Sequence, residues 1–171
     1  GGGPDGRAVV PRRPFRISNS VGIGCSVRIL VANPFGIGDV LFSIPLVRAL
    51  RHAYPTGFIG FLCNRRTEEL GASWPELSWH RTFEKDEFRQ AWARSKREGA
   101  AMVRGLFEEV RRERFDLFLD LSLGWHYGLA AALAGIPQRG GFDYRGRGRF
   151  LTRRLLLNGF DQRPVAEYYL D

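Results

Sequence analysis

The chain is 171 residues long, 44% hydrophobic and 13% aromatic, with a formal net charge of +8. Its length is sufficient for one domain with a buried core, and its composition excludes a disordered chain. No apolar run approaches the ~20 residues that a membrane-spanning helix needs. The two cysteines, Cys25 and Cys63, do not form the pattern of a disulfide framework or of a CxxC metal site.

The positive charge comes almost entirely from arginine. Lys85 and Lys96 are the only lysines among 26 basic residues. An excess of positive charge suits an anionic partner, such as a phosphorylated substrate, an acidic lipid headgroup or nucleic acid. A genome of biased base composition also uses arginine in place of lysine, so the charge has two interpretations at this point.

The chain begins with a segment, 1–26, that is rich in Gly, Pro and Arg and lacks hydrophobic periodicity, which predicts a flexible tail. The run VRILVAN at 27–33 is short, apolar and rich in branched residues, and it predicts a buried strand. Apolar residues then recur at helical spacing over 39–55. We expect one helix there, with Pro45 near its first turn and Pro55 after its end.

Strand and helix patterns alternate through the rest of the chain. We expect strands at 57–63, 79–83, 115–121 and 138–143, a loop with a short helix at 64–73, one or two surface helices over 86–114, and a small-residue helix at 124–136. This order, with nearly continuous apolar strands, predicts an α/β domain whose parallel sheet is covered on both faces. Ligands of such sheets bind outside the carboxyl ends of the strands, so the functional residues should follow the strands.

The first strand leads into a Gly-x-Gly turn, Gly36-Ile37-Gly38, which raises the hypothesis of a dinucleotide site. The third glycine of that fingerprint is absent, and the second strand ends without a carboxylate to hold a ribose. Arg65 and Arg66 follow that strand and could accept a 2′-phosphate, so an NADP-binding module stays open as an alternative. Against it, the carboxylate of Asp39 at the helix start would repel a pyrophosphate.

Asp39 itself has two interpretations. A carboxylate at a helix start can cap the helix by accepting the N–H bonds left unpaired there, which is worth ~1 kcal/mol. It can also act on a ligand bound at this edge of the sheet. Gly36 and Gly38 likewise either form a tight turn that needs a positive φ or let a ligand approach the backbone closely.

Three collinear segments resemble glycosyltransferase family 9, the ADP-heptose:lipopolysaccharide heptosyltransferases. The first is RILVANPFGIGDVLFSIPLVRALRHAYP (28–55), which is similar to the family's strand, loop ending in Ile-Gly-Asp, and helix followed by Pro. The other two are FDLFLDLSLGWHYGLAAALAGIPQRGGFD (115–143) and RGRFLTRRLLLNGFDQRPVAEYYLD (147–171). The resemblance therefore covers about residues 27–171.

The resemblance implies a Rossmann-like parallel sheet with helices on both faces, which is the N-terminal half of the two-domain GT-B arrangement. We expect an acceptor-binding domain over 27–160 and the start of an interdomain connection over 161–171. On this expectation the C-terminal donor domain is absent and the chain is inactive alone. The family's chemistry implies no metal ion or other cofactor.

The same resemblance implies the partners and the location. They are a nucleotide-sugar donor such as ADP-heptose, bound by the absent domain, and an anionic, lipid-linked saccharide acceptor of the lipopolysaccharide core. No nucleic acid is expected. A cytoplasmic location is implied, with peripheral contact at the inner membrane of a Gram-negative-type bacterium.

The family's reaction is an inverting sugar transfer, in which a base accepts the proton of the acceptor hydroxyl. The family's aspartate matches Asp39, which we expect to be that base, with Gly36 and Gly38 making room for the acceptor. Arginine forks bind anionic groups in bidentate fashion. The candidates for binding the acceptor are Arg65, Arg66, Arg145, Arg147 and Arg149, together with Ser122 and His126 after the fourth strand. Each arginine has a solvated surface charge as its alternative.

The loop after the fourth strand departs from the family pattern, because Ser122 stands where the family usually has Gln. We expect Asp120, at the end of that strand, to brace the loop and not to be a second acid. A basic nucleic-acid-binding domain, suggested by the net charge of +8, is the remaining alternative. The chain shows neither a sheet motif that combines aromatic and basic residues nor a recognition helix.

Overall fold

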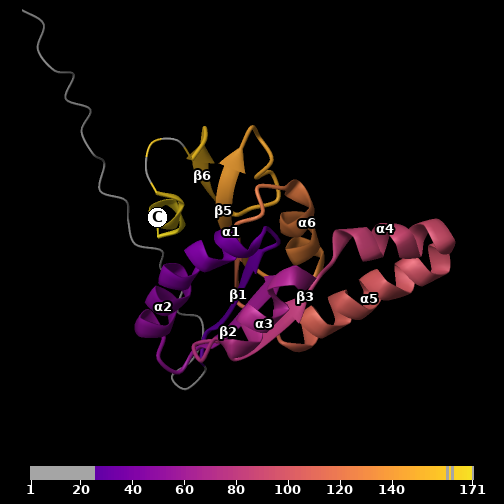
Figure 1. Cartoon of the computed structure of the whole chain (residues 1–171), viewed down its shortest axis with the longest axis horizontal. Helices are drawn as coiled ribbons and strands as arrows, with labels where there is room; N and C mark the ends of the chain where they lie inside the picture. Colours follow the sequence, from indigo (N-terminus) through magenta and orange to yellow (C-terminus); the bar gives the residue numbers. More distant parts are fainter. Residues whose placement is uncertain (1–25, 161, 163, 171) are drawn as a thin grey trace, which may run out of the picture.

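The computed structural model describes residues 26–160, 162 and 164–170, so the predicted tail lies outside the described residues apart from Ser26. Its centre is a six-stranded parallel sheet in the order β3-β2-β1-β4-β5-β6. Figure 1 shows the helices arranged around this sheet. The strands are β1 (Arg28–Asn33), β2 (Phe58–Cys63), β3 (Trp79–Thr82), β4 (Leu117–Asp120), β5 (Gln138–Tyr144) and β6 (Arg153–Leu157). The predicted α/β class with a parallel sheet is confirmed.

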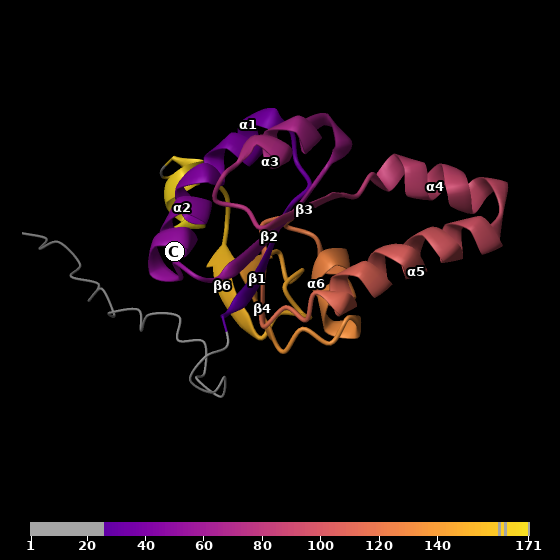
Figure 2. The same ribbon diagram turned by 90° about the horizontal axis from the view of Figure 1, so that it is seen from below.

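Helices connect the strands and cover both faces of the sheet. They are α1 (Ile37–Phe42), α2 (Ile44–Ala53), the short 3₁₀ helix η1 (Arg65–Thr67), α3 (Glu68–Ser73), α4 (Lys85–Arg94), α5 (Lys96–Arg112), α6 (Trp125–Leu133) and α7 (Val165–Tyr169). Figure 2 shows α1, α2 and α3 on one side of the sheet and α5 and α6 on the other, with the α4–α5 hairpin projecting from the body. None of the described helices combines the length and apolarity needed to cross a bilayer.

The two faces of β1 explain the two halves of the core. Ile29 and Val31 belong to a buried cluster with residues of α1 and α2, whereas Leu30 and Ala32 belong to a second cluster with residues of α5 and α6. Side chains of a strand point alternately to opposite faces, so an apolar residue at every position is what a strand covered on both sides requires.

The predicted helix over 39–55 is wrong in one respect, because the structure breaks it at Ser43. Pro45 carries no N–H and its ring crowds the carbonyl four residues earlier, so a regular helix cannot run through it. The N–H of Ser43 therefore donates to the Val40 carbonyl, three residues back, at 3.0 Å. The break leaves the carbonyl of Asp39 without its usual helical partner.

The sixth strand and the last helix were not among the predicted elements. β6 is an edge strand with mostly exposed or half-exposed residues, and Leu156 is 87% exposed, so it lacks the apolar run of a buried strand. α7 packs against α1 and α2, with Tyr168 and Tyr169 buried. The assignment of 161–171 to an interdomain connection stays a prediction.

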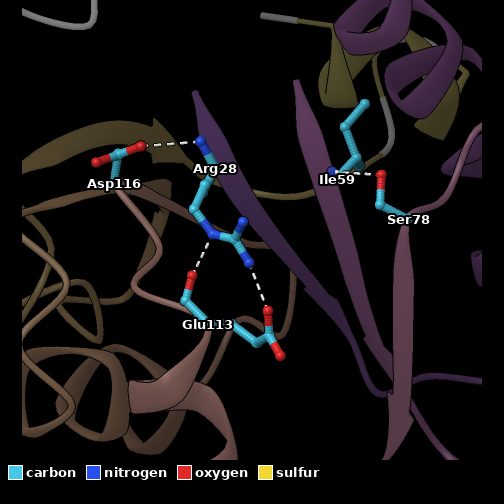
Figure 3. A network of polar contacts seen from close by, with 5 residues as sticks. All are labelled: Arg28, Ile59, Ser78, Glu113 and Asp116. Atoms are coloured by element: carbon cyan, nitrogen blue, oxygen red, sulfur yellow. Dashed lines mark hydrogen bonds and ion pairs between the residues drawn. The ribbon is translucent and has the colours of Figure 1, made fainter. Parts of the chain in front are cut away.

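The amino end of β1 is tied to the turn between α5 and β4 by Arg28 (Figure 3). Its backbone N–H donates to the Asp116 carboxylate at 2.8 Å, and its guanidinium donates to both the carbonyl and the carboxylate of Glu113. The guanidinium also lies 3.7 Å from the centre of the Phe58 ring. These contacts explain why an arginine interrupts the apolar run of the sequence at the first position of β1.

The packing of β4 against β5 predicts the effect of a methyl group at Gly141. A Cβ there would lie 2.9 Å from the Cβ of Asp120 and closer still to its carbonyl oxygen. We expect Gly141→Ala to lower the free energy of unfolding by ~1–3 kcal/mol, measured by urea denaturation. The matched control is Gly105→Ala in α5, where a Cβ meets open space. That variant should gain ~0.5–1 kcal/mol, and equal effects at the two glycines would contradict the prediction.

Candidate functional site

The carboxyl ends of the central strands meet at one edge of the sheet. Ala32 of β1 pairs with Asp120 of β4, and Asp120 pairs in turn with Gly141 of β5. On the other side of β1, Asn33 pairs with Cys63 of β2. All the residues predicted to form the site lie in the loops and helix starts that follow these strands. This edge is where an open parallel sheet binds its ligands.

Asp39 lies in the first turn of α1, but it does not cap the helix. The N-cap is Gly36, which has no side chain to accept a cap hydrogen bond, and Asp39 is the third helical residue. Its side chain is half-buried and makes no hydrogen bond or ion pair with any residue that the structure describes. The capping interpretation of Asp39 is therefore wrong, and its carboxylate is left available to a ligand.

The backbone of Asp39 is held by Asn33, the fully buried last residue of β1. The Asn33 side-chain amide donates to the Asp39 carbonyl at 3.0 Å and to Oγ of Ser43 at 2.7 Å. Its Oδ1 accepts from the N–H of Phe35 at 3.2 Å. One side chain thus satisfies the carbonyl that the helix break released and shapes the loop before α1. The sequence placed Asn33 in the functional segment 33–39 that follows the first strand but gave it no role of its own; the signal was a polar residue ending a buried strand, directly before Pro34.

A second asparagine holds the same loop from β2. Asn64 follows β2 directly, and its amide donates to the carbonyls of Pro34, at 3.2 Å, and Phe35. The hydroxyl of Thr67 in turn donates to Oδ1 of Asn64 at 3.3 Å, which orients the amide. The loop between β1 and α1 is therefore fixed from both of these neighbouring strands.

Gly36 and Gly38 are not needed for a positive φ. The φ of Gly36 is −69°, and among the described glycines only Gly135 and Gly146 have positive values. A Cβ added at Gly36 or Gly38 would meet nothing within 4 Å. The tight-turn interpretation of these two glycines is wrong, and both present open backbone at the carboxyl edge.

Tyr169 of α7 reaches the same place from the end of the chain. Burial, and next to it the charge of Asp39, raise the pKa of Tyr169 to about 12, while a hydrogen bond with the Asn33 side chain acts in the opposite direction. The phenol is therefore neutral at ordinary pH and lies close enough to Asp39 to sense its charge. Sequence analysis did not identify Tyr169, because no local pattern links residue 169 to the first strand.

Of the two arginines after β2, one is engaged by a carboxylate. The guanidinium of Arg65 pairs with the Glu87 carboxylate at the start of α4, in an exposed ion pair. Arg66 is exposed and forms no ion pair with a described residue. The NADP alternative needs both Arg65 and Arg66 to hold a 2′-phosphate. Because Glu87 already pairs with Arg65, that alternative is weakened.

The loop after β4 is organised by Asp120, as predicted. Its Oδ1 accepts from the N–H of Ser122 at 2.9 Å. Burial raises the pKa of Asp120 to about 6, against the lowering effect of its hydrogen bonds with Ser122 and the Gly128 backbone. The hydroxyl of Ser122 is itself buried and bonds with the backbone of Gly124, so Ser122 contributes to the shape of its own loop.

Arginines and aromatic rings alternate in the turn after β5. The guanidinium carbons of Arg145 and Arg147 lie 5.0 and 5.8 Å from the centre of the Tyr144 ring. Arg145 has a φ of +53°, and the N–H of Gly148 donates to Asp143 at 2.9 Å, so the turn has a fixed shape. It presents two exposed guanidinium groups beside an aromatic face.

The start of α6 continues this surface. The guanidinium carbon of Arg149 lies 4.9 Å from the centre of the Trp125 ring. The exposed ring of His126 stacks on Trp125 with 4.0 Å between the ring centres. The loops after β4 and β5 thus form one surface of positive charge and aromatic rings, suited to an anionic ligand.

No protein-family model matches the chain, and a search of curated proteins finds no match. Solved structures do match. ADP-heptose lps heptosyltransferase II of E. coli superposes with a TM-score of 0.65 at 25% identity, over 84% of this chain and 39% of that chain. A glycosyl transferase family 9 protein from Veillonella parvula gives 0.66 and 17%, over 84% and 39%. E. coli heptosyltransferase WaaC with ADP-2-deoxy-2-fluoro heptose gives 0.71 and 15%, over 84% and 46%.

The resemblance to heptosyltransferases and family 9 glycosyltransferases is therefore confirmed in three dimensions, and with it the Rossmann-like fold class. The likenesses at 15% and 17% identity concern the fold alone. This chain spans less than half the length of each of these structures, a share that fits the N-terminal half of a two-domain enzyme.

The Asn33 contacts predict a loss of stability when the amide is removed. In Asn33→Ala, the Asp39 carbonyl and the Ser43 hydroxyl lose a buried partner. We expect the free energy of unfolding to fall by ~1–3 kcal/mol, measured by urea denaturation. Asn158→Ala, at an exposed position, is the control and should stay within ~0.5 kcal/mol of wild type. A neutral Asn33→Ala would show that these hydrogen bonds are not needed.

The raised pKa of Asp120 predicts a pH dependence of stability. In the folded state the carboxyl group of Asp120 keeps its proton up to about pH 6, whereas in the unfolded chain it loses the proton near the ordinary pKa of 3.8. The free energy of unfolding should therefore fall as the pH rises through this window. The Asp120→Asn variant has no carboxyl group to titrate at this position, so it serves as the reference. The unfolding free energy of wild type relative to Asp120→Asn should drop by on the order of 2–3 kcal/mol between pH 4 and pH 7. A constant difference across that range would contradict the raised pKa.

Proposed function

We propose that this chain is the acceptor-binding domain of an inverting glycosyltransferase, with Asp39 as its general base. The observation that carries the proposal is the Asp39 carboxylate. It stands at the ligand-binding edge of the sheet on a fixed backbone and is not engaged by any described hydrogen-bond or ion-pair partner. The similarity to heptosyltransferase II of E. coli supports a glycosyltransferase-like function for such a site.

The proposed reaction is a single displacement at the anomeric carbon of the donor sugar. The acceptor hydroxyl gives its proton to Asp39, and its oxygen forms a bond to the anomeric carbon of the donor sugar. The bond from that carbon to the nucleoside diphosphate breaks on the opposite face, which inverts the anomeric configuration. The contribution of this chain is to hold the base and the acceptor in place. The open backbone at Gly36 and Gly38 leaves room for the acceptor beside the carboxylate.

We propose that the acceptor is an anionic saccharide of the lipopolysaccharide-core type. Arg66, Arg145, Arg147 and Arg149 are exposed at the carboxyl edge, and guanidinium groups bind carboxylates and phosphates in bidentate fashion. The rings of Tyr144 and Trp125 hold three of these guanidinium groups in place. A cytoplasmic location at the surface of the inner membrane, where such a lipid-linked acceptor would be met, is part of the same proposal.

The donor in this proposal is a nucleotide sugar, and ADP-heptose is the candidate. Two of the similar structures are of WaaC with ADP or with ADP-2-deoxy-2-fluoro heptose. The donor would bind to a second domain, because the loop between β1 and α1 of this chain carries a carboxylate where a diphosphate would need the positive helix end.

Replacement of Asp39 tests the base assignment. In a protein that joins this chain to a nucleotide-sugar-binding second domain, we expect Asp39→Asn to lower the transfer rate by ~10²–10⁴-fold, because the proton acceptor is lost while the shape is kept. The measurement is the initial rate of nucleoside diphosphate release with an inner-core saccharide acceptor.

Glu108→Gln is the matched control for this experiment, because it also exchanges a carboxylate for an amide. Glu108 lies on α5, where it pairs with Arg104 between two exposed side chains, and it is not part of the loops that follow the strands. That variant should keep its transfer rate within ~10-fold of wild type, since an exposed pair contributes little. If Asp39→Asn retained a rate comparable to that of Glu108→Gln, the assignment of Asp39 as the base would be wrong.

A further inference from the structure

An apolar pocket of about 360 Å³ lies between the α4–α5 hairpin, α6 and the sheet face that these helices cover. Figure 2 shows α6 beside the hairpin on that side of the sheet. Its walls include Leu30, Leu62 and Phe118 from the strands, Val103 and Leu106 from α5, and Ala130 from α6. Its volume lies at the lower end of the ~300–1,000 Å³ typical of ligand pockets.

The pocket follows from the small residues of α6. The alanines that α6 turns toward the sheet have short side chains, so the helix leaves space that larger residues would fill. An apolar pocket of this kind favours an apolar ligand, because moving apolar surface out of water lowers the free energy. A ligand with polar groups along its length would lose hydrogen bonds inside, since the described walls offer few partners.

Two of the residues that line the pocket carry polar side chains that are exposed. Among the described residues that line it, Arg89 of α4 and His126 of α6 are exposed, whereas the other lining residues are buried or half-buried. The carboxylate that pairs with Arg89 is that of Asp86, at 3.7 Å between two exposed side chains, a weak pair that a ligand can replace. His126 is the second residue of α6, which follows β4.

We propose that this pocket binds the aliphatic chain of an anionic amphiphile, with the headgroup at Arg89 and His126. The apolar walls take the chain, and the exposed side chains of Arg89 and His126 take a carboxylate or phosphate. The proposal rests on the pocket alone, so it can hold or fail independently of sugar transfer, and its test measures binding only.

The test uses the full 171-residue chain and isothermal titration calorimetry with dodecanoate at pH 8, below the concentration at which micelles form. We expect saturable one-to-one binding with a dissociation constant below about 1 mM. Along octanoate, decanoate and dodecanoate the affinity should rise by up to about fourfold per methylene until the chain fills the pocket. Dodecan-1-ol, which has the same chain without the charge, should bind more weakly.

Two pairs of variants locate the site. Ala130→Phe fills the pocket and should weaken dodecanoate binding at least about tenfold, whereas Ala101→Phe, exposed on α5, should not change it. Arg89→Gln should weaken dodecanoate about two- to fivefold and leave dodecan-1-ol unchanged. Its control is Arg94→Gln on the same helix, whose guanidinium pairs with Glu98 and lies outside the pocket lining.

Absence of saturable binding to the wild-type chain would overturn the proposal, and so would equal affinities of wild type and a folded Ala130→Phe. If Ala130→Phe does not fold by circular dichroism, the Arg89→Gln pair decides: equal loss for dodecanoate and dodecan-1-ol, or no loss for either, overturns it. A comparison of dodecanoate with 1-dodecanoyl-lysophosphatidylglycerol distinguishes a free fatty acid from an acyl lipid as the natural source.

Discussion

The candidate site depends on one buried amide, that of Asn33. Pro45 prevents a continuous helix, the break at Ser43 releases the Asp39 carbonyl, and the Asn33 amide binds both the carbonyl and the Ser43 hydroxyl. A hydrogen bond left unmade in a buried place is costly, so this arrangement has few alternatives. The position of the Asp39 carboxylate is thereby coupled to the buried end of β1, a strand paired on both sides.

The residues at the two ends of β1 make contacts of different kinds. At its amino end Arg28 binds Glu113 and Asp116 and fixes the strand against the turn before β4. At its carboxyl end Asn33 organises a loop that leaves a carboxylate and two glycines open. A ligand site needs side chains that are not satisfied by the protein itself, and the surrounding structure must hold them in place. Here the backbone of Asp39 has its hydrogen-bond partners, whereas its side chain has none among the residues that the structure describes.

Sequence patterns predicted the elements that depend on local runs of apolar residues. They missed the elements and contacts that depend on residues far away in the sequence. The buried strands and the parallel sheet follow from their continuous apolar runs. Strand β6 was not predicted because much of this edge strand faces solvent and so lacks a continuous apolar run. The contact of Tyr169 with Asn33 was not predicted because these two residues lie far apart in the sequence. The capping interpretation of Asp39 failed because the helix begins earlier than the apolar spacing indicated, at Ile37, with Gly36 as its N-cap. The role of Asp39 in transfer came from resemblance and stays a proposal.

The structure also separates the two interpretations of the net charge. Several exposed arginines have a carboxylate partner on the helices: Arg65, Arg81, Arg94 and Arg104. Exposed pairs of this kind contribute only ~0–1 kcal/mol each, as expected of arginines that composition alone supplies. The described arginines without an ion-pair partner around the carboxyl edge are different, because aromatic rings hold three of them: Arg145, Arg147 and Arg149. Positive charge without a described carboxylate partner, at the same edge of the sheet as a candidate base, suits an anionic acceptor, so this part of the charge is the part we assign to function.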